Sequence, residues 1–451
     1  MWISYCKMLS SQQEVLANCR YFFQPCSACL FKYANFLLST IGSLRGSAFE
    51  TLSIALPIGI SFFTFTQIAF LADTYQGKVR EYRFIHYVLF VTYFPHLVAG
   101  PVLHHKEMMP QFGDSRTYTF STSNFSVGLT IFVLGLAKKL LIADSLAPYA
   151  DALFSTPHRP SFFIAWGGVL AYAFQLYFDF SGYSDMAIGL SRLFGIRLPL
   201  NFNSPYKSVS IAEFWRRWHM TLSRFLRDYL YITLGGNRHG RARRYLNLMI
   251  TMLLGGLWHG AGWGYVAWGG LHGLYFVINH AWSKFSTTIN FPTESTAWKF
   301  SATLLTFFSV CIAWVFFRSP TVDSAVQIVT GMAGGFGVGI PEAIAIRLGG
   351  FRSQLEYYGV VFFIGGGSHF LETWIWTFFA AFIAFTFPNT QQITSQYEPA
   401  LDSDCHHDRD RRGLHFLVWH PTRKWALLIG LLAVVSLISI NRPSEFLYFQ
   451  F

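Results

Sequence analysis

Long apolar stretches constrain this chain more than any other feature of its sequence. Lipid offers no hydrogen-bonding partners, so a stretch of about 20 apolar residues must satisfy its backbone internally, as a helix does. Only 13% of the 451 residues are charged and 52% are hydrophobic, whereas a soluble domain is nearer a quarter charged. We therefore predict an all-α, polytopic integral membrane protein that has the lipid bilayer as a partner. The clearest stretches are Leu52–Ala72, Phe84–Leu103, Phe125–Leu146, Phe162–Phe180, Trp298–Phe317, Leu371–Phe387 and Trp425–Ile440.

Several of these predicted helices carry features that bend or interrupt them. Pro57 predicts a bend in the first span, and Pro95 starts the break of the second. Lys138 and Lys139 lie inside the third span, where they must reach an interface or point into the protein. The fourth runs into Asp179–Asp185, whose serines and glycine predict a break. With the segments around the central histidines included, we expect about nine to eleven membrane-crossing helices, together with interfacial or re-entrant ones.

The chain shows no internal repeat with a period of 20 to 50 residues. Residues 1–28 are mostly polar and form a separate N-terminal segment. Residues 29–451 form a single membrane domain, in which the glycine-rich Gly331–Gly367 predicts a loop with a short apolar piece.

The basic charge of the chain does not indicate nucleic-acid binding. The formal net charge is +11, but the cations lie in short loops between apolar spans, as expected for loops on the cytoplasmic side of a membrane. Cys26 and Cys29 have CxxC spacing, yet no second pair completes a zinc site and no redox fold surrounds them. We predict no nucleic-acid partner.

Residues Ile211–Tyr231 combine helical periodicity with a high density of arginine and tryptophan. Apolar residues recur at three- and four-residue spacing, which predicts one amphipathic helix with His219 at the edge of the apolar face. Two interpretations stay open: an interfacial helix that contacts lipid phosphates, or the lining of a site.

His259 is the strongest catalytic candidate. Leucines, tryptophans and glycines surround it in sequence, and the glycines allow close approach of another chain or of a substrate. Such surroundings favour the neutral imidazole, which can act as a general base near neutral pH. The alternative is a core histidine bonded to a backbone carbonyl. His272, next to Gly273, is a weaker candidate.

Other clusters carry less functional signal. Asp179 and Asp185 could form a carboxylate pair, but the serines between them favour turn and capping roles. His104–His105 and Cys405–Asp408 lie in loops and lack a complete ligand set, so we predict no metal site.

Read in order, these segments resemble the membrane-bound O-acyltransferase superfamily, and most of all the bacterial branch with the alginate O-acetyltransferase membrane subunit and the D-alanyl transfer protein of teichoic acid modification. The C-terminal Phe446–Phe451 is similar to the alginate-type ending. The other matching motifs are Phe31–Phe36, Leu56–Phe65, Phe94–Pro101, Phe178–Asp185, Asn201–Tyr206, Phe214–Ser223 and Trp258–Gly260.

This resemblance implies a ring of tilted helices around a funnel, and catalysis by His259 with His219 as the second family histidine. It also implies a bacterial cytoplasmic (inner) membrane location, acetyl-CoA as acyl donor with no bound cofactor, and an extracytoplasmic SGNH-type acetyltransferase or polysaccharide-modification complex as partner. The family carries further helices before Phe31–Phe36, so we expect an N-terminal truncation. The substrate-binding candidates beside these histidines are Trp215, Arg216, Arg217, Trp258, Asp179 and Asn203.

Two alternatives stay open for the function. A related transferase would take D-alanine from a carrier-protein thioester, and a transporter or flippase would use the histidines as proton relays. The absence of repeated halves argues against transport.

Overall fold

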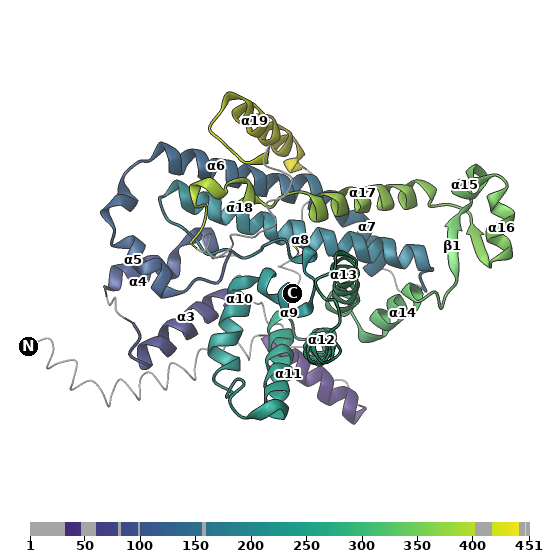
Figure 1. The fold of residues 1–451 in the computed structure, drawn as a ribbon, viewed down its shortest axis with the longest axis horizontal. Helices are drawn as coiled ribbons and strands as arrows, with labels where there is room; N and C mark the ends of the chain where they lie inside the picture. Colours follow the sequence, from purple (N-terminus) through teal and green to yellow (C-terminus); the bar gives the residue numbers. More distant parts are fainter. Residues whose placement is uncertain are drawn as a thin grey trace, which may run out of the picture.

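The computed structural model describes residues 32–46, 60–79, 83–97, 100–155, 159–401, 417–441 and Leu447, and this part of the chain is mostly helical (Figure 1). The predicted bend at Pro57, the cysteines of the CxxC pair, the segment 1–28 and Cys405–Asp408 lie outside these residues. The α-helices are 32–45, α3 (Ile60–Tyr75), α4 (Phe84–Thr92), α5 (His105–Phe112), α6 (Thr122–Ala137), α7 (Asp144–Phe154), α8 (Phe162–Leu193), α9 (Ile211–Arg217), α10 (Met220–Phe225), α11 (Gly240–His259), α12 (Trp263–Thr288), α13 (Thr296–Arg318), α14 (Val322–Met332), α15 (Glu342–Ala345), α16 (Phe351–Tyr357), α17 (Gly367–Thr386), α18 (Thr390–Ile393) and α19 (Arg423–Ile438).

Shorter turns and two strands connect these helices. The 3-10 turns are η1 (Phe94–His96), η2 (Ser115–Tyr118), η4 (Pro205–Lys207), η6 (Ile346–Leu348), η7 (Ser395–Tyr397) and η10 (Ser439–Asn441). The π-helical turns are η3 (Lys138–Ala143) and η5 (Leu226–Tyr231), and the strands are β1 (Val338–Pro341) and β2 (Val360–Phe363).

Four helical segments in the described part of the chain are long and apolar enough to cross a membrane, judged by length and composition. They are Thr122–Phe154, Phe162–Leu193, Thr296–Arg318 and Gly367–Thr386. The predicted total of nine to eleven crossings and the ring around a funnel stay predictions.

Helix α8 is the centre of the fold, in contact with α6, α7, α13, α14 and α17 (Figure 1). It continues unbroken through Asp179–Asp185, so the break predicted there is wrong. The small residues of this segment serve helix packing instead: a Cβ on Gly182 would lie 2.7 Å from the Gly135 carbonyl oxygen of α6. Seven residues further along α8, a Cβ on Gly189 would lie 2.6 Å from the Gly128 carbonyl oxygen of α6. Small residues let two helix backbones approach closely inside a membrane protein.

The charged residues between α6 and α8 are paired inside the protein. Lys139 Nζ lies 2.7 Å from Asp144 and 2.8 Å from Asp179. Lys138 Nζ lies 2.5 Å from Asp185, which also accepts a hydrogen bond from Thr390. The lysines therefore point inward, and the two aspartates act in ion pairs rather than in the predicted turns and caps.

The chain is not entirely helical. Strands β1 and β2 pair in parallel, with Val338 opposite Val360. They enclose α15, η6 and α16, which together form a small unit at one end of the molecule (Figure 1). Because this unit occupies Gly331–Gly367, the prediction of a loop there is wrong, whereas the described chain is mostly helical, as predicted.

Candidate functional site

His259 is the last residue of α11, so its side chain lies where the helix stops. Its imidazole is half-buried and packs among three aromatic rings. The ring centroids of Trp258, Trp268 and Phe317 lie 4.7, 5.2 and 5.1 Å away. Among the described residues, the buried Nδ1 of His259 has no hydrogen-bond partner. The alternative of an Nδ1–H donated to a backbone carbonyl therefore finds no support there.

The glycines around His259 bring in another helix. A Cβ on Gly269 of α12 would clash with the Met252 carbonyl oxygen of α11, and a Cβ on Gly260 would overlap the Tyr265 ring. The sequence left open whether these glycines allow the close approach of another chain segment or of a substrate. The structure shows the close approach of a chain segment, α12. This approach places Trp268 of α12 against His259.

The N-terminal helix 32–45 caps the end of α11. Lys32 Nζ donates to the carbonyl oxygens of Trp258 at 2.5 Å and His259 at 3.2 Å, and the Tyr33 hydroxyl donates to that of Leu257 at 2.7 Å. The last carbonyls of a helix have no partner within the helix, and cations are favourable there. Burial lowers the pKa of Lys32 to about 8. Lys32 and Tyr33 thus fix the backbone that carries His259.

The periodicity of Ile211–Tyr231 predicted one continuous helix through His219, and this prediction is wrong. Helix α9 ends at Arg217, and His219 adopts a left-handed conformation with φ of 43° before α10 begins. The Asn201 side-chain oxygen lies 2.9 Å from His219 Nδ1 and also accepts from Thr221. This network assigns the ring proton to Nδ1. The Nε2 of His219 is buried and has no partner among the described residues.

A stack of tryptophans connects the two histidines. The ring centroid of Trp218, next to His219, lies 5.1 Å from that of Trp314, and Trp314 lies 5.9 Å from Trp268. Trp268 in turn makes a T-shaped contact with His259 at 5.2 Å. His272 of α12 also contacts Trp268, at 4.9 Å, and accepts a hydrogen bond from the Trp215 indole at 3.2 Å. The structure therefore adds His272, the weaker candidate of the sequence, to this aromatic cluster.

The remaining predicted substrate-binding residues divide between this cluster and structural contacts. Trp215 belongs to the cluster, and Trp258 stacks on Phe65 at 4.7 Å. Arg217 pairs with Glu213 at 2.8 Å, and the Asn203 side chain accepts from Asn389 at 2.8 Å. Asp179, as described above, pairs with Lys139. Arg216 is exposed and lines a cavity.

This cavity lies between α9, α10, α11 and α12 and has a volume of about 520 Å³. Trp215 forms part of its wall, next to apolar residues such as Met252 and Phe276. Its basic lining consists of Arg216, Arg224, Arg227, Arg244 and His280. The indole of Trp215 lines this cavity and donates a hydrogen bond to His272, so it connects the cavity to the aromatic cluster.

A large part of the sequence matches known proteins. Residues 5–320 match the model of MBOAT, the membrane-bound O-acyltransferase family. The chain belongs to this family. A peptidoglycan O-acetyltransferase of Helicobacter pylori is 47% identical over 335 residues, 69% of this chain and 63% of the relative. A probable alginate O-acetylase AlgI of Pseudomonas putida is 47% identical over 307 residues, 67% of this chain and 61% of the relative.

A more distant relative acts on a different type of polymer, by its name. A teichoic acid D-alanyltransferase of Streptococcus thermophilus is 30% identical over 251 residues, 52% of this chain and 59% of that protein. The chain spans about three fifths of the length of these curated relatives.

Proposed function

We propose that this protein is an O-acyltransferase of the bacterial cytoplasmic membrane. It takes an acetyl group from acetyl-CoA on the cytoplasmic side and passes it across the membrane for O-acetylation of an extracytoplasmic polysaccharide such as alginate. A secreted SGNH-type acetyltransferase, or a polysaccharide-modification complex, is the partner that completes this transfer. The observation that carries the proposal is the half-buried imidazole of His259, whose Nδ1 has no partner among the described residues.

His259 acts as the general base in this proposal. Its imidazole removes the proton of the acceptor hydroxyl, and the hydroxyl oxygen attacks the thioester carbonyl carbon. The carbon–sulfur bond then breaks, and the leaving thiolate takes up the proton that the imidazole received. His219 orients or polarises the reacting groups through Nε2, because Nδ1 is engaged by Asn201.

The basic cavity supports a phosphate-bearing donor. Arginine side chains bind phosphates through two parallel hydrogen bonds, and Arg216 lines the cavity with an exposed side chain. The apolar wall next to Trp215 leads toward His272 and Trp268. Acetyl-CoA bound here would place its phosphates at the arginines and its thioester toward the aromatic cluster.

Labelled acetyl-CoA tests this function directly. The purified chain in lipid nanodiscs is given labelled acetyl-CoA together with the extracytoplasmic partner acetyltransferase, with alginate oligosaccharides or peptidoglycan fragments as acceptors. We expect label on the acceptor and release of CoA thiol, both lost in His259→Gln and kept in the exposed control His420→Ala. Transfer that survives in His259→Gln would contradict the catalytic role of His259.

The D-alanyltransferase relative favours a second candidate, transfer from a carrier-protein thioester. In that case acetyl-CoA gives no product, and a D-alanyl-loaded carrier protein does. Transport of an acyl compound without any transfer to an acceptor would instead support the flippase alternative.

A further inference from the structure

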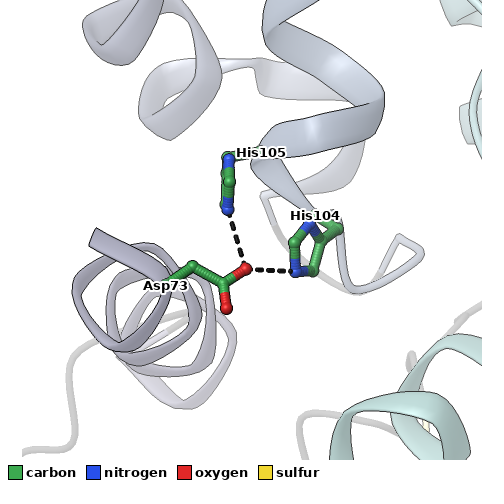
Figure 2. A group of neighbouring side chains, drawn as sticks. All are labelled: Asp73, His104 and His105. Carbon is green, nitrogen blue, oxygen red and sulfur yellow. Dashed lines mark hydrogen bonds and ion pairs between the residues drawn. The ribbon is translucent and has the colours of Figure 1, made fainter. Parts of the chain in front are cut away.

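Three potential metal ligands meet at a place that the acyl-transfer site does not use (Figure 2). Asp73 lies near the end of α3, and His104 and His105 lie at the start of α5. The Nε2 atoms of the two histidines lie 3.1 and 2.9 Å from the same oxygen of Asp73, Oδ2. The donor atoms of all three side chains lie within 4.8 Å of one another. The two adjacent histidines alone form no ligand set, and α3 supplies the third member.

The Asp73 oxygen lies among several polar groups. Oδ2 accepts hydrogen bonds from His105 Nε2 at 2.9 Å and from the Tyr229 hydroxyl at 3.1 Å. His104 Nε2 and Lys106 Nζ lie 3.1 and 3.3 Å from the same oxygen. A cation at this point would be bound by the lone pairs of the carboxylate and of the two imidazoles.

We propose that Asp73, His104 and His105 bind a divalent transition-metal ion of the Zn²⁺ type. Two imidazole nitrogens and one carboxylate form a ligand set that suits Zn²⁺, with a fourth position left for another ligand. The Tyr229 hydroxyl, 2.6 Å from His104 Nε2, or a water molecule would occupy this position. The Lys106 side chain is about half exposed, so it can turn away to solvent when the metal enters.

The cluster is also accessible from outside. His104 is 20% exposed, whereas Asp73 and His105 are almost completely buried. A metal ion can therefore enter past His104 and then bind to two groups that the fold already holds in place. The cluster lies outside the four apolar helices of the described chain that are long enough to cross a membrane.

Zn²⁺ binding to the full chain tests the proposal. The chain is purified in detergent, treated with a chelator, and titrated with Zn²⁺ alone by calorimetry. We expect one site per chain with micromolar or tighter affinity, weakened at least about tenfold in Asp73→Asn and in His105→Ala. The exposed control His420→Ala should bind like the unmodified protein. Thermal unfolding with and without Zn²⁺ provides a second measurement, because a bound metal raises the unfolding temperature.

His104→Ala guards against a folding defect, since its side chain is the least buried of the three. It should keep the metal-free unfolding temperature close to that of the unmodified chain and lose the increase caused by Zn²⁺. Equal Zn²⁺ affinity in all variants, or no binding at micromolar Zn²⁺, would overturn the proposal. Because this test measures metal binding and stability, its outcome is independent of acyl transfer.

Discussion

Two helix pairs in this molecule use the same packing and treat polar groups in opposite ways. Glycines bring α6 and α8 together, and glycines also bring α11 and α12 together. Between α6 and α8 the buried Lys139 and the half-buried Lys138 each face a carboxylate. Between α11 and α12 the buried His259 Nδ1 and His272 Nε2 have no partner among the described residues. The ion pairs stabilise the packing of α6 against α8, whereas the unpaired imidazole nitrogens between α11 and α12 are available to bind a substrate.

The largest effect should follow from changing His259. His259→Gln removes the proposed general base, and acetyl transfer should fall about 100- to 10,000-fold. The unfolding temperature should change little, because the Nδ1 that is lost makes no described hydrogen bond. Initial rates with labelled acetyl-CoA and a thermal unfolding curve measure both. A clearly lower unfolding temperature together with an unchanged transfer rate would contradict this difference between the two helix pairs.

The opposite result is expected for Lys139. Lys139→Met leaves two buried carboxylates, Asp144 and Asp179, without their cation, and should destabilise the protein by about 3 to 5 kcal/mol. Denaturant unfolding in detergent measures the change.

Lys138→Met is the matched control for this substitution, since it affects one carboxylate, Asp185, which keeps its hydrogen bond from Thr390. Its destabilisation should be smaller. Equal effects of the two substitutions would show that the second carboxylate of Lys139 contributes nothing.

A smaller effect is expected when the cap of α11 is removed. Lys32→Met frees the carbonyls of Trp258 and His259, and kcat should fall roughly tenfold, the equivalent of a hydrogen bond to a charged group. Lys32→Arg, which keeps a cationic donor, should restore part of the rate, and the exposed Lys78→Met should have no effect.

The pH dependence provides an independent measurement of the same cap. Because the pKa of Lys32 is lowered to about 8, the ammonium is present below pH 8 and is lost above it. The kcat of the unmodified chain should therefore decline above about pH 8, and that of Lys32→Arg should not. Parallel pH profiles for the two proteins would contradict the role of the Lys32 ammonium in fixing the backbone at His259.

The smallest effect concerns Trp215. Trp215→Phe keeps an aromatic ring but loses the N–H that His272 accepts, which costs about 1 kcal/mol, or roughly fivefold in transfer rate. Trp282→Phe is the control, since that ring packs against Trp298, away from the histidines. A rate equal to that of the control would mean that His272 needs no fixed orientation.

The sequence predicted the elements whose signals are local. Trp298–Phe317 and Leu371–Phe387 correspond closely to α13 and α17, because an apolar run of this length determines a helix by itself. The inward-pointing Lys138 and Lys139 were one of two predicted outcomes. The break in the second half of Phe84–Leu103 was also predicted from Pro95, and α4 ends at Thr92, before η1, which contains Pro95.

Other features depend on partners that are distant in the sequence. Serine and glycine at 181–184 predict a break only if no helix lies beside them, and α6 lies there. The period of Ile211–Tyr231 matches one helix, but Asn201 engages His219 at a left-handed turn. His104–His105 lacked a third ligand until α3 brought Asp73 to it. No spacing within a single segment contains this information.

The cap on α11 also sets the order in which the protein can mature. Lys32 and its acceptor at Trp258 are 226 residues apart, and at about 5 to 20 residues per second this separation corresponds to roughly 10 to 45 seconds of synthesis. Helix 32–45 is therefore synthesised first and can form these hydrogen bonds only after the end of α11 has left the ribosome. A nascent chain that ends before residue 257 lacks these hydrogen bonds, so the backbone at His259 can be fixed only after this part of the chain has been synthesised.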